Sequence, residues 1–503
     1  MPRCVGRGSF HERPRRAREP GNATAVIVTR RVRRARQLTI DQQVRDYALT
    51  RRDFLLATAA GAGLALLPSA ATAAPGRLRA REANVALAGA AYPQTGVWGY
   101  EGSVPGPELR FRQGERLKIE VENLLSADTT VHFHGIRLPN AMDGVPELTQ
   151  APIAARGGKF VYEFALPDAG TYWYHPHLGS PEQVGRGLYG ALVVEEAMAP
   201  AVDRDRVWVL GDWRLDREAR IVGDFGNFMD ASHAGRIGNT VTVNGAVRET
   251  FEVRAGERLR LRLVNAANAR IFGLDFRGHD PLVIALDGHP VEPHRPEGGR
   301  VVLGPAMRAD LLLDATGEPG RAYPVVDDFY RQRAYRLLDL RYAKDALRGA
   351  PARGGLARMR PNTMPEPELE RAERHRVVFG GGMMGGMPMM GMMRGAAWTV
   401  NGAPIREHDH HPILTLGLGR SYVLEFVNDT QWHHPIHLHG HAFRVIARNG
   451  RATRYREWLD TVLLAPRERA EIAFVADNPG DWMFHCHVLE HQVSGMMAVI
   501  RVA

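Results

Sequence analysis

The feature that most constrains the fold is a ten-residue motif that occurs three times. It spans residues 114–123 (GERLKIEVEN), recurs at 256–265 (GERLRLRLVN) and returns more loosely at 419–428, always with Gly and Asn nine positions apart. A glycine turn followed by alternating apolar residues is typical of a β-strand with one face on a core. Val104-Pro105-Gly106, Val243-Asn244-Gly245 and Val400-Asn401-Gly402 begin 10, 13 and 19 residues before the three copies. The repeat therefore predicts an all-β chain of three consecutive Greek-key β-sandwich domains.

Breaks in this pattern set the expected boundaries. We place domain 1 at 75–198, domain 2 at 199–350, a charged, proline-rich linker at 351–371 and domain 3 at 372–503. Within domain 3, residues 380–393 (GGGMMGGMPMMGMM) hold seven of the 17 methionines and show neither strand nor helix periodicity. This composition predicts a loop.

Residues 1–74 have the composition of an export leader. They contain 14 Arg, no Lys and five acidic residues, so they account for the whole formal charge of +9. The neutral remainder argues against a nucleic-acid partner. The run at 50–56 (TRRDFLL), an apolar stretch and small residues at 71–73 resemble a twin-arginine export signal. We expect a periplasmic or otherwise exported protein with no stable membrane insertion after the signal is removed.

Cysteine usage points to a metal. Beyond the leader the sequence has one cysteine, Cys486, and therefore no internal disulfide. In an exported protein a lone thiol is a liability unless it is buried and inert or bound to a metal.

Histidines cluster in four segments, at 132–135 (HFHG), 175–177 (HPH), 434–439 (HPIHLH) and 485–491 (HCHVLEH). Residues i and i+2 of a strand share a face, so each His-x-His presents two imidazoles side by side. One such pair is more often structural than functional. Four pairs supply eight convergent ligands, which indicates several metal ions of a kind that imidazole suits, namely copper, zinc or iron.

The last histidine segment narrows the choice of metal. Cys486, His491 and Met496 follow one another at intervals of five residues, and with His434 they form a His₂Cys set with a weak axial methionine. This set is typical of blue-copper electron-transfer sites. His485 and His487 flank the cysteine on the opposite face, so one tripeptide can join the two sites.

These segments resemble those of the multicopper oxidase family, which includes laccases and bacterial cuprous oxidases built from three cupredoxin domains. The resemblance implies three cupredoxin-like domains and four copper ions per chain. It places type 2 copper on His132 and His437, the type 3 pair on His134, His175, His177, His439, His485 and His487, and type 1 copper on His434, Cys486, His491 and Met496.

The distribution of these residues assigns roles to the domains. Residues 170–177 align with 480–487, with Pro176 in place of the cysteine, so domain 1 cannot build a type 1 site. Domain 2 has no His-x-His after Asn265 and is expected to act as a spacer. The three-copper cluster should lie between domains 1 and 3.

The resemblance implies one-electron oxidation of phenols, aromatic amines or Cu(I), coupled to four-electron reduction of dioxygen to water. We expect substrate to bind near His434 or His491, with an accessible imidazole edge, and electrons to follow Cys486 to its two flanking histidines. Asp143 matches the family's acid near the cluster and is expected to deliver protons. Gln492 stands where some relatives carry a second acid.

Substrate choice stays open at this point. Thioethers favour Cu(I), so the loop can gather cuprous ions or serve as a lid without a metal. The loop methionines are Met383, Met384, Met387, Met389, Met390, Met392 and Met393. The positions where cuprous oxidases carry an acid and a methionine hold Thr430 and Trp432, which leaves Asp429 as a displaced candidate. The alternative function is periplasmic copper sequestration without turnover, and we expect a monomer in either case.

We expect structural or surface roles for the remaining histidines and for Met497. We interpret His433 and His441 as neighbours of the site or surface residues, and His408, His410 and His411 as a solvated loop. Met497 is expected to pack in the core.

Overall fold

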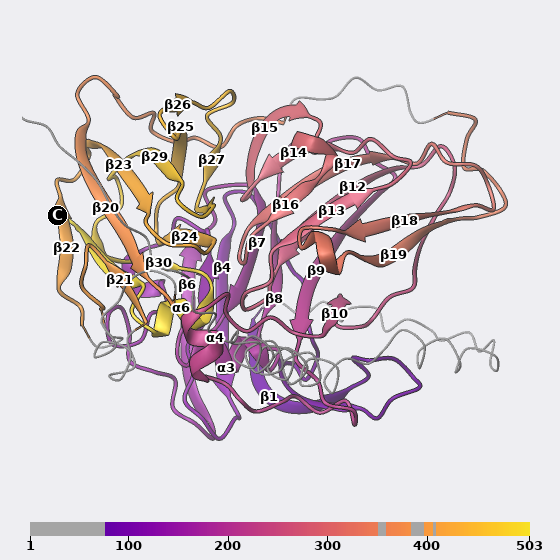
Figure 1. Ribbon diagram of the computed structural model, residues 1–503, viewed down its shortest axis with the longest axis horizontal. Helices are drawn as coiled ribbons and strands as arrows, with labels where there is room; N and C mark the ends of the chain where they lie inside the picture. Colours follow the sequence, from indigo (N-terminus) through magenta and orange to yellow (C-terminus); the bar gives the residue numbers. More distant parts are fainter. Residues whose placement is uncertain (1–75, 351–358, 384–396, 406–408) are drawn as a thin grey trace, which may run out of the picture. The chain divides into compact units, whose positions relative to one another are not determined.

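The computed structural model describes residues 76–350, 359–383, 397–405 and 409–503. These residues form six β-sheets, two in each of three consecutive segments (Figure 1). The predicted all-β class is confirmed. The predicted leader at 1–74 lies outside the described residues. Within the described ranges, no helix has the length and apolar character needed to cross a bilayer.

The first segment contains the sheets β2-β1-β4-β6 and β3-β8-β7-β5. Its strands are β1 (Arg77–Val85), β2 (Thr95–Tyr100), β3 (Leu109–Arg112), β4 (Arg116–Asn123), β5 (His132–His134), β6 (Gly158–Ala165), β7 (Gly170–His175) and β8 (Gly190–Glu195). Two short helices, η1 (Asn140–Met142) and α3 (Ser180–Gly185), interrupt the loops.

The second segment contains the sheets β10-β9-β12-β17-β14-β15 and β11-β19-β18-β13-β16. Its strands are β9 (Arg204–Trp213), β10 (Thr240–Val243), β11 (Thr250–Val253), β12 (Arg258–Asn265), β13 (Phe272–Phe276), β14 (Leu282–Leu286), β15 (His289–His294), β16 (Val301–Leu303), β17 (Arg308–Asp314), β18 (Ala322–Asp327) and β19 (Tyr335–Tyr342). Its helical turns are α4 (Phe228–Ser232), η2 (Glu297–Gly299) and η3 (Arg331–Arg333).

The third segment contains the sheets β21-β20-β23-β29-β25-β26, with β27 on β25, and β22-β31-β30-β24-β28. Its strands are β20 (Glu373–Gly381), β21 (Trp398–Val400), β22 (Pro412–Leu416), β23 (Ser421–Asn428), β24 (His434–Leu438), β25 (Phe443–Arg448), β26 (Arg451–Ala452), β27 (Trp458–Leu459), β28 (Thr461–Leu464), β29 (Arg469–Val475), β30 (Gly480–Cys486) and β31 (Met497–Val502). Helix α6 (Leu489–Val493) packs against α4 (Figure 1).

The three copies of the repeat form equivalent strands. β4, β12 and β23 each pair in parallel with the first strand of their segment, which is β1, β9 or β20, and antiparallel with β6, β17 or β29. Their glycines adopt left-handed φ values, which only glycine adopts without steric cost. The values are +85° at Gly114, +81° at Gly256 and +75° at Gly419.

The buried asparagine that ends each copy of the repeat anchors backbone segments through its side chain. Asn123, Asn265 and Asn428 are buried, and each side-chain amide donates to two or more backbone carbonyls while its oxygen accepts the backbone N–H two residues later. Each asparagine thus satisfies buried loop groups that would otherwise destabilise the fold.

Two sequence expectations need correction. The turn equivalent to Asn244-Gly245 and Asn401-Gly402 is Glu101-Gly102, not residues 104–106, because all three pairs have positive φ and are closed by a one-pair β-bridge. The methionine-rich loop also begins later than residue 380. Gly380 and Gly381 belong to β20, where they pair with β21.

The apolar core links the first and third segments. One buried cluster runs through both and includes Phe133, Ile436 and Phe484, each beside a metal-motif histidine, whereas the second segment has its own cluster. Because residues of a strand alternate between faces, packing of these apolar neighbours fixes the direction of the histidines.

Candidate metal centre

Strand pairing sets the register of the histidine motifs. β5 and β7 are antiparallel neighbours with His132 opposite His175. β24 and β30 are paired in the same way, with His437 opposite His485 and Ile436 opposite Cys486. The alternation of strand faces therefore places His-x-His pairs from two sheets on surfaces that can meet.

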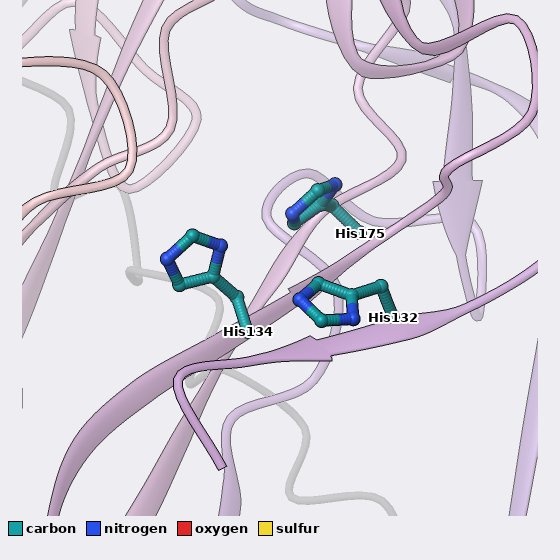
Figure 2. A group of neighbouring side chains, drawn as sticks. All are labelled: His132, His134 and His175. Atoms are coloured by element: carbon teal, nitrogen blue, oxygen red, sulfur yellow. The ribbon is translucent and has the colours of Figure 1, made fainter. Parts of the chain in front are cut away.

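The eight histidines do meet, across the first and third segments. Ring centroids are 3.7 Å apart for His134 and His437 and 4.0 Å apart for His132 and His439. Figure 2 shows His132, His134 and His175, whose ring nitrogens include three within 4.8 Å of one another. The trios His132, His437, His439 and His177, His439, His485 meet the same criterion. His487 completes the set, with its ring 5.1 Å from that of His134 and 5.2 Å from that of His175.

The free ring nitrogens fit a group of bound cations. His132 Nδ1 lies 2.7 Å from the carbonyl oxygen of Asp143, and His437 Nδ1 lies 2.8 Å from that of Asp460. Each Nδ1–H donates there, so each Nε2 carries a lone pair. Several buried ring nitrogens have no hydrogen-bond partner among the described residues, namely Nε2 of His132, His175, His177 and His437, Nδ1 of His134 and both nitrogens of His487. Such unpaired groups are costly unless a metal ion receives them.

Burial also selects the protonation state that binds metal. It lowers the pKa of His485 to about 4, so this imidazole is neutral near pH 7. The other histidines with lowered pKa in this group are His134, His175, His177, His437, His439 and His487. Neutral imidazole is the ligand form for copper.

A second, smaller site surrounds Cys486. Its Sγ lies 3.4 Å from His434 Nδ1 and 3.7 Å from His491 Nδ1, and all three side chains are fully buried. Burial raises the pKa of the Cys486 thiol, so a nearby cation is needed to hold the thiolate. The Met496 N–H donates to the His491 carbonyl, and the Met496 carbonyl accepts from Cys486 N–H.

The far nitrogens of this site are engaged. His491 Nε2–H donates to the carbonyl of His233 at 2.7 Å, and His434 Nε2–H donates to the Thr430 hydroxyl at 2.8 Å. Thr430 in turn donates to Asn428, the asparagine of the third repeat. Both Nδ1 atoms therefore present lone pairs beside the sulfur, as a soft metal requires.

The prediction that His434 or His491 has a solvent-accessible imidazole edge is wrong. Both residues are 0% exposed because Trp398, itself buried, lies against them with ring centroids 5.1 and 4.2 Å away. Trp398 is fixed by its Nε1–H, which donates to the carbonyl of Ala231 at the end of α4. His233, whose carbonyl contacts His491, is half-buried.

Asp143 joins the two halves of the large site. Its Oδ2 accepts from His439 Nδ1 at 2.8 Å, and its carbonyl accepts from His132 Nδ1. The carboxyl is fully buried. Gln492 is buried beside the same site, with its amide nitrogen 3.4 Å from His177 Nδ1.

Sequence reasoning missed Asp460. Its Oδ1 lies 3.0 Å from His134 Nε2, and it is ion-paired with Arg308 of the second segment. Neither residue belongs to a spaced motif. The available signal was an acid between the apolar pair Trp458–Leu459 and the strand that follows, a position that strand burial makes costly unless the charge is partnered.

The remaining candidates lie outside the two sites. His441 is buried against Phe474 and Trp482, and Met497 is buried in the core. Asp429 is exposed and ion-paired with Arg467. His410 lies at a small cavity that reaches His177. His433 packs against Phe329, Met383 is exposed, and His408 and the predicted loop methionines from Met384 to Met393 fall outside the described residues.

Comparisons with known proteins all indicate the same family. Three family models described as multicopper oxidase match residues 81–198, 204–347 and 386–503. A multicopper oxidase of Mycobacterium tuberculosis is 31% identical over 441 residues, which cover 79% of this chain and 81% of the relative. A copper resistance protein A homologue of Pseudomonas syringae is 26% identical, with 80% and 88% covered.

Solved structures agree. A multicopper oxidase from Pseudomonas thermotolerans superposes with a TM-score of 0.77 at 38% identity, covering 86% of this chain and all of the other. A metallo-oxidase from Campylobacter jejuni gives a TM-score of 0.72 at 26% identity, covering 85% and 90%. The three β-sandwiches of the present chain are cupredoxin-like. The chain belongs to the multicopper oxidase family and is a copper-dependent oxidoreductase.

Proposed function

We propose that the chain removes single electrons from a reducing substrate and uses four of them, with four protons, to reduce one dioxygen to two waters. The observation that carries the proposal is the tripeptide 485–487, in which Cys486 lies in one buried site and both flanking histidines lie in the other. When bound, copper supplies one-electron redox chemistry at the first site and the place of dioxygen reduction at the second.

The residues fit four ions. We assign type 1 copper to His434, Cys486, His491 and Met496. We assign type 2 copper to His132 and His437, and the type 3 pair to His134, His175, His177, His439, His485 and His487. The convergence of the ring nitrogens and the lowered pKa of buried imidazoles such as His437 support this assignment. The assigned ligands fall within the proposed domains 1 and 3, at 75–198 and 372–503.

Protons must reach a buried site. Asp143 is placed to hold one next to His439 and His132, since its carboxyl oxygens lie 2.8 and 3.2 Å from their Nδ1 atoms. We propose that Asp143 delivers protons to the reduction site. Gln492 cannot donate an acidic proton, so any second path there relies on water.

Electrons enter near α4. The His233 carbonyl accepts from His491, and the His233 ring lies against Trp432 with centroids 5.4 Å apart. The backbone N–H of Met383 donates to Ser232, so Met383 lies beside the same helix end. Phe228, Met229 and Met383 are 47%, 58% and 46% exposed. This exposed surface offers thioethers to Cu(I) and apolar contact to a phenol or aromatic amine, and we propose that substrate binds there.

Oxygen uptake tests the proposal. Copper-loaded protein should consume dioxygen with Cu(I) or a phenol, with one dioxygen consumed per four electrons. The variants Met229→Leu and Met383→Leu keep apolar volume but remove the thioethers, so they should slow Cu(I) oxidation and leave phenol oxidation unchanged. Met198→Leu, at another exposed methionine, is the matched control. Absence of uptake by fully loaded protein would leave copper sequestration as the function.

We also propose export through the twin-arginine pathway, which carries folded proteins and therefore suits assembly of a buried metal site. Replacing Arg51 and Arg52 together with lysine should retain the protein in the cytoplasm. Unchanged export of this variant would argue against the pathway.

A further inference from the structure

The second segment, which holds none of the proposed copper ligands, places a buried, charged side chain beside the histidine site. Arg308, at the start of β17, is fully buried. Its Nη1 lies 2.8 Å from Asp460 Oδ1 and its Nη2 lies 2.5 Å from Oδ2, a two-pronged contact. Its Nε–H donates to the carbonyl of Thr171 in β7 of the first segment. One guanidinium therefore touches all three segments.

Asp460 connects Arg308 to two histidines of the site. Its Oδ1 accepts from His134 Nε2 at 3.0 Å, and its backbone carbonyl accepts from His437 Nδ1 at 2.8 Å. A neutral imidazole has one N–H, so the contact with Asp460 leaves the lone pair of His134 on Nδ1. That Nδ1 is one of the buried nitrogens without a partner among the described residues.

Close packing keeps the ion pair in place. A Cβ on Gly135 would lie 2.4 Å from Asp460 Oδ2 and 2.5 Å from Arg308 Nη2. The glycine that follows the first His-x-His thus gives the pair its room. Asp287 also contacts the chain on either side of this pair. Its Oδ1 accepts from the backbone N–H of Arg308, and its Oδ2 accepts from the backbone N–H of Thr461.

We infer that Arg308 is a positioning residue for the multi-histidine site, acting through Asp460 to fix the orientation and tautomer of His134 and the place of His437. The inference rests on the proposed copper assignment. Groups that orient metal ligands commonly change metal affinity roughly 10- to 100-fold when removed. Domain 2 is then part of the metal site's support, beyond the spacer role expected from the sequence.

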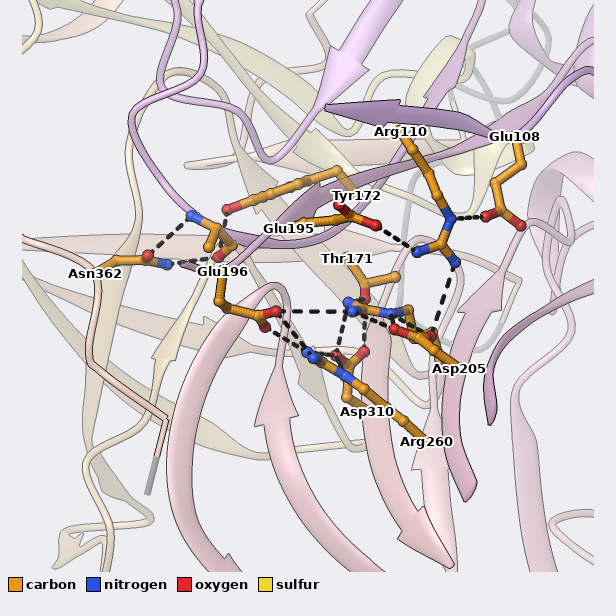
Figure 3. Close-up of polar contacts among 12 residues, drawn as sticks. Glu108, Arg110, Thr171, Tyr172, Glu195, Glu196, Asp205, Arg260, Asp310 and Asn362 are labelled. Carbon is orange, nitrogen blue, oxygen red and sulfur yellow. Dashed lines mark hydrogen bonds and ion pairs between the residues drawn. The ribbon is translucent and has the colours of Figure 1, made fainter. Parts of the chain in front are cut away.

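Arg260 offers a matched control (Figure 3). It is 1% exposed and lies in β12 of the same sheet, where it pairs with Glu196 and Asp310. Neither of these partners has a hydrogen bond to a metal-motif histidine among the described residues. Replacing Arg260 therefore removes an equally buried cation between the first two segments without releasing Asp460.

The test compares Arg308→Met with Arg260→Met, both loaded with copper in parallel with the wild type. Electron paramagnetic resonance reads the type 2 copper, the intense visible absorption reads the type 1 copper, and total copper is counted. We expect Arg308→Met to bind type 2 copper about tenfold more weakly or with altered hyperfine splitting, while its visible absorption persists. Arg260→Met should match the wild type in all three measurements.

A double variant separates positioning from loss of fold. Arg308→Met with Asp460→Asn removes both charges of this pair. The amide oxygen can still accept from His134, and the backbone carbonyl of residue 460 can still accept from the type 2 ligand His437, so the type 2 signal should recover toward that of the wild type. Identical type 2 spectra and copper content for Arg308→Met and Arg260→Met would overturn the inference. A wild type that shows no type 2 signal when fully loaded would overturn the proposed copper assignment and this inference with it.

Discussion

The Nε2 atoms of His439 and His485 lie 3.1 Å apart, and each carries a lone pair. The reason is that His439 Nδ1–H donates to Asp143 and His485 Nδ1–H donates to the carbonyl of Cys486. Two facing lone pairs repel each other in the metal-free protein and attract a cation between them.

Copper removal should therefore destabilise the folded chain. Because copper binds the folded state, each site contributes about 2.7 kcal/mol when free copper is 100 times its dissociation constant. We expect calorimetry to show a lower transition temperature after chelation and recovery when copper is restored. Magnesium, which prefers oxygen ligands, is the control and should have no effect. Equal transition temperatures with and without copper would contradict the predicted fit.

Substitution of Cys486 separates the two sites. Cys486→Ser replaces the thiolate with a poor copper ligand, so the intense visible absorption should disappear and turnover should stop. The buried hydroxyl should cost about 1–3 kcal/mol of stability. Type 2 resonance should remain, because His132 and His437 are untouched. Met497→Leu, at a buried neighbour in the same core, is the control and should keep the absorption. Turnover that survives in Cys486→Ser would refute the electron path.

Asp143→Asn tests proton delivery. The amide keeps the size of the side chain and contact with His439 but cannot supply an acidic proton. General acid catalysis commonly contributes about 10²- to 10⁴-fold, so kcat should fall in that range while the visible absorption persists. The dependence of kcat on pH should change as well. Asp168→Asn, at a buried carboxylate paired with Arg137, is the control. A kcat and pH profile like those of the wild type would exclude this role.

His289 should make the fold sensitive to acid. It is 2% exposed and contacts Asn362, and burial lowers its pKa to about 4, against about 6.5 in an unfolded chain. The unfolded state therefore binds more protons between these values, and stability is lost as the pH falls from 6.5 toward 4. At pH 5 the loss from this residue is about 2 kcal/mol.

Urea unfolding of metal-free protein at pH 7 and pH 5 checks this expectation. His289→Gln should lose less stability than the wild type over that interval, because the variant has no group to protonate at this position. Equal losses for the two proteins would show that the imidazole is not the sensitive group.

Local patterns were sufficient to predict much of the molecule. Gly114 and Asn123 recur with constant spacing because each has a local task, a left-handed turn and a loop anchor, and such tasks leave a mark in sequence. The eight histidines were recognisable for a similar reason, since strand geometry converts a spacing of two residues into a shared face. The position of Glu101-Gly102 was missed because its turn lacks the asparagine of the other two copies.

Contacts between segments could not be predicted in this way. His434 and His491 were expected to be accessible, yet Trp398 covers both, and its place depends on how β21 packs beside α4. Asp460 and Arg308 are 152 residues apart and share no spacing rule. Only the packing of three sandwiches brings them together.

The sequence by itself determined the all-β class, the repeat and the side chains available to both buried sites, because these follow from short-range periodicity and from the chemistry of imidazole and thiol. The tertiary structure alone decided which ring nitrogens are left free, which carboxylates hold the rings, and that Arg308 of the middle segment supports a site it does not ligate. These features depend on hydrogen bonds and ion pairs between residues distant in the chain, whose geometry is fixed only when the sheets pack together.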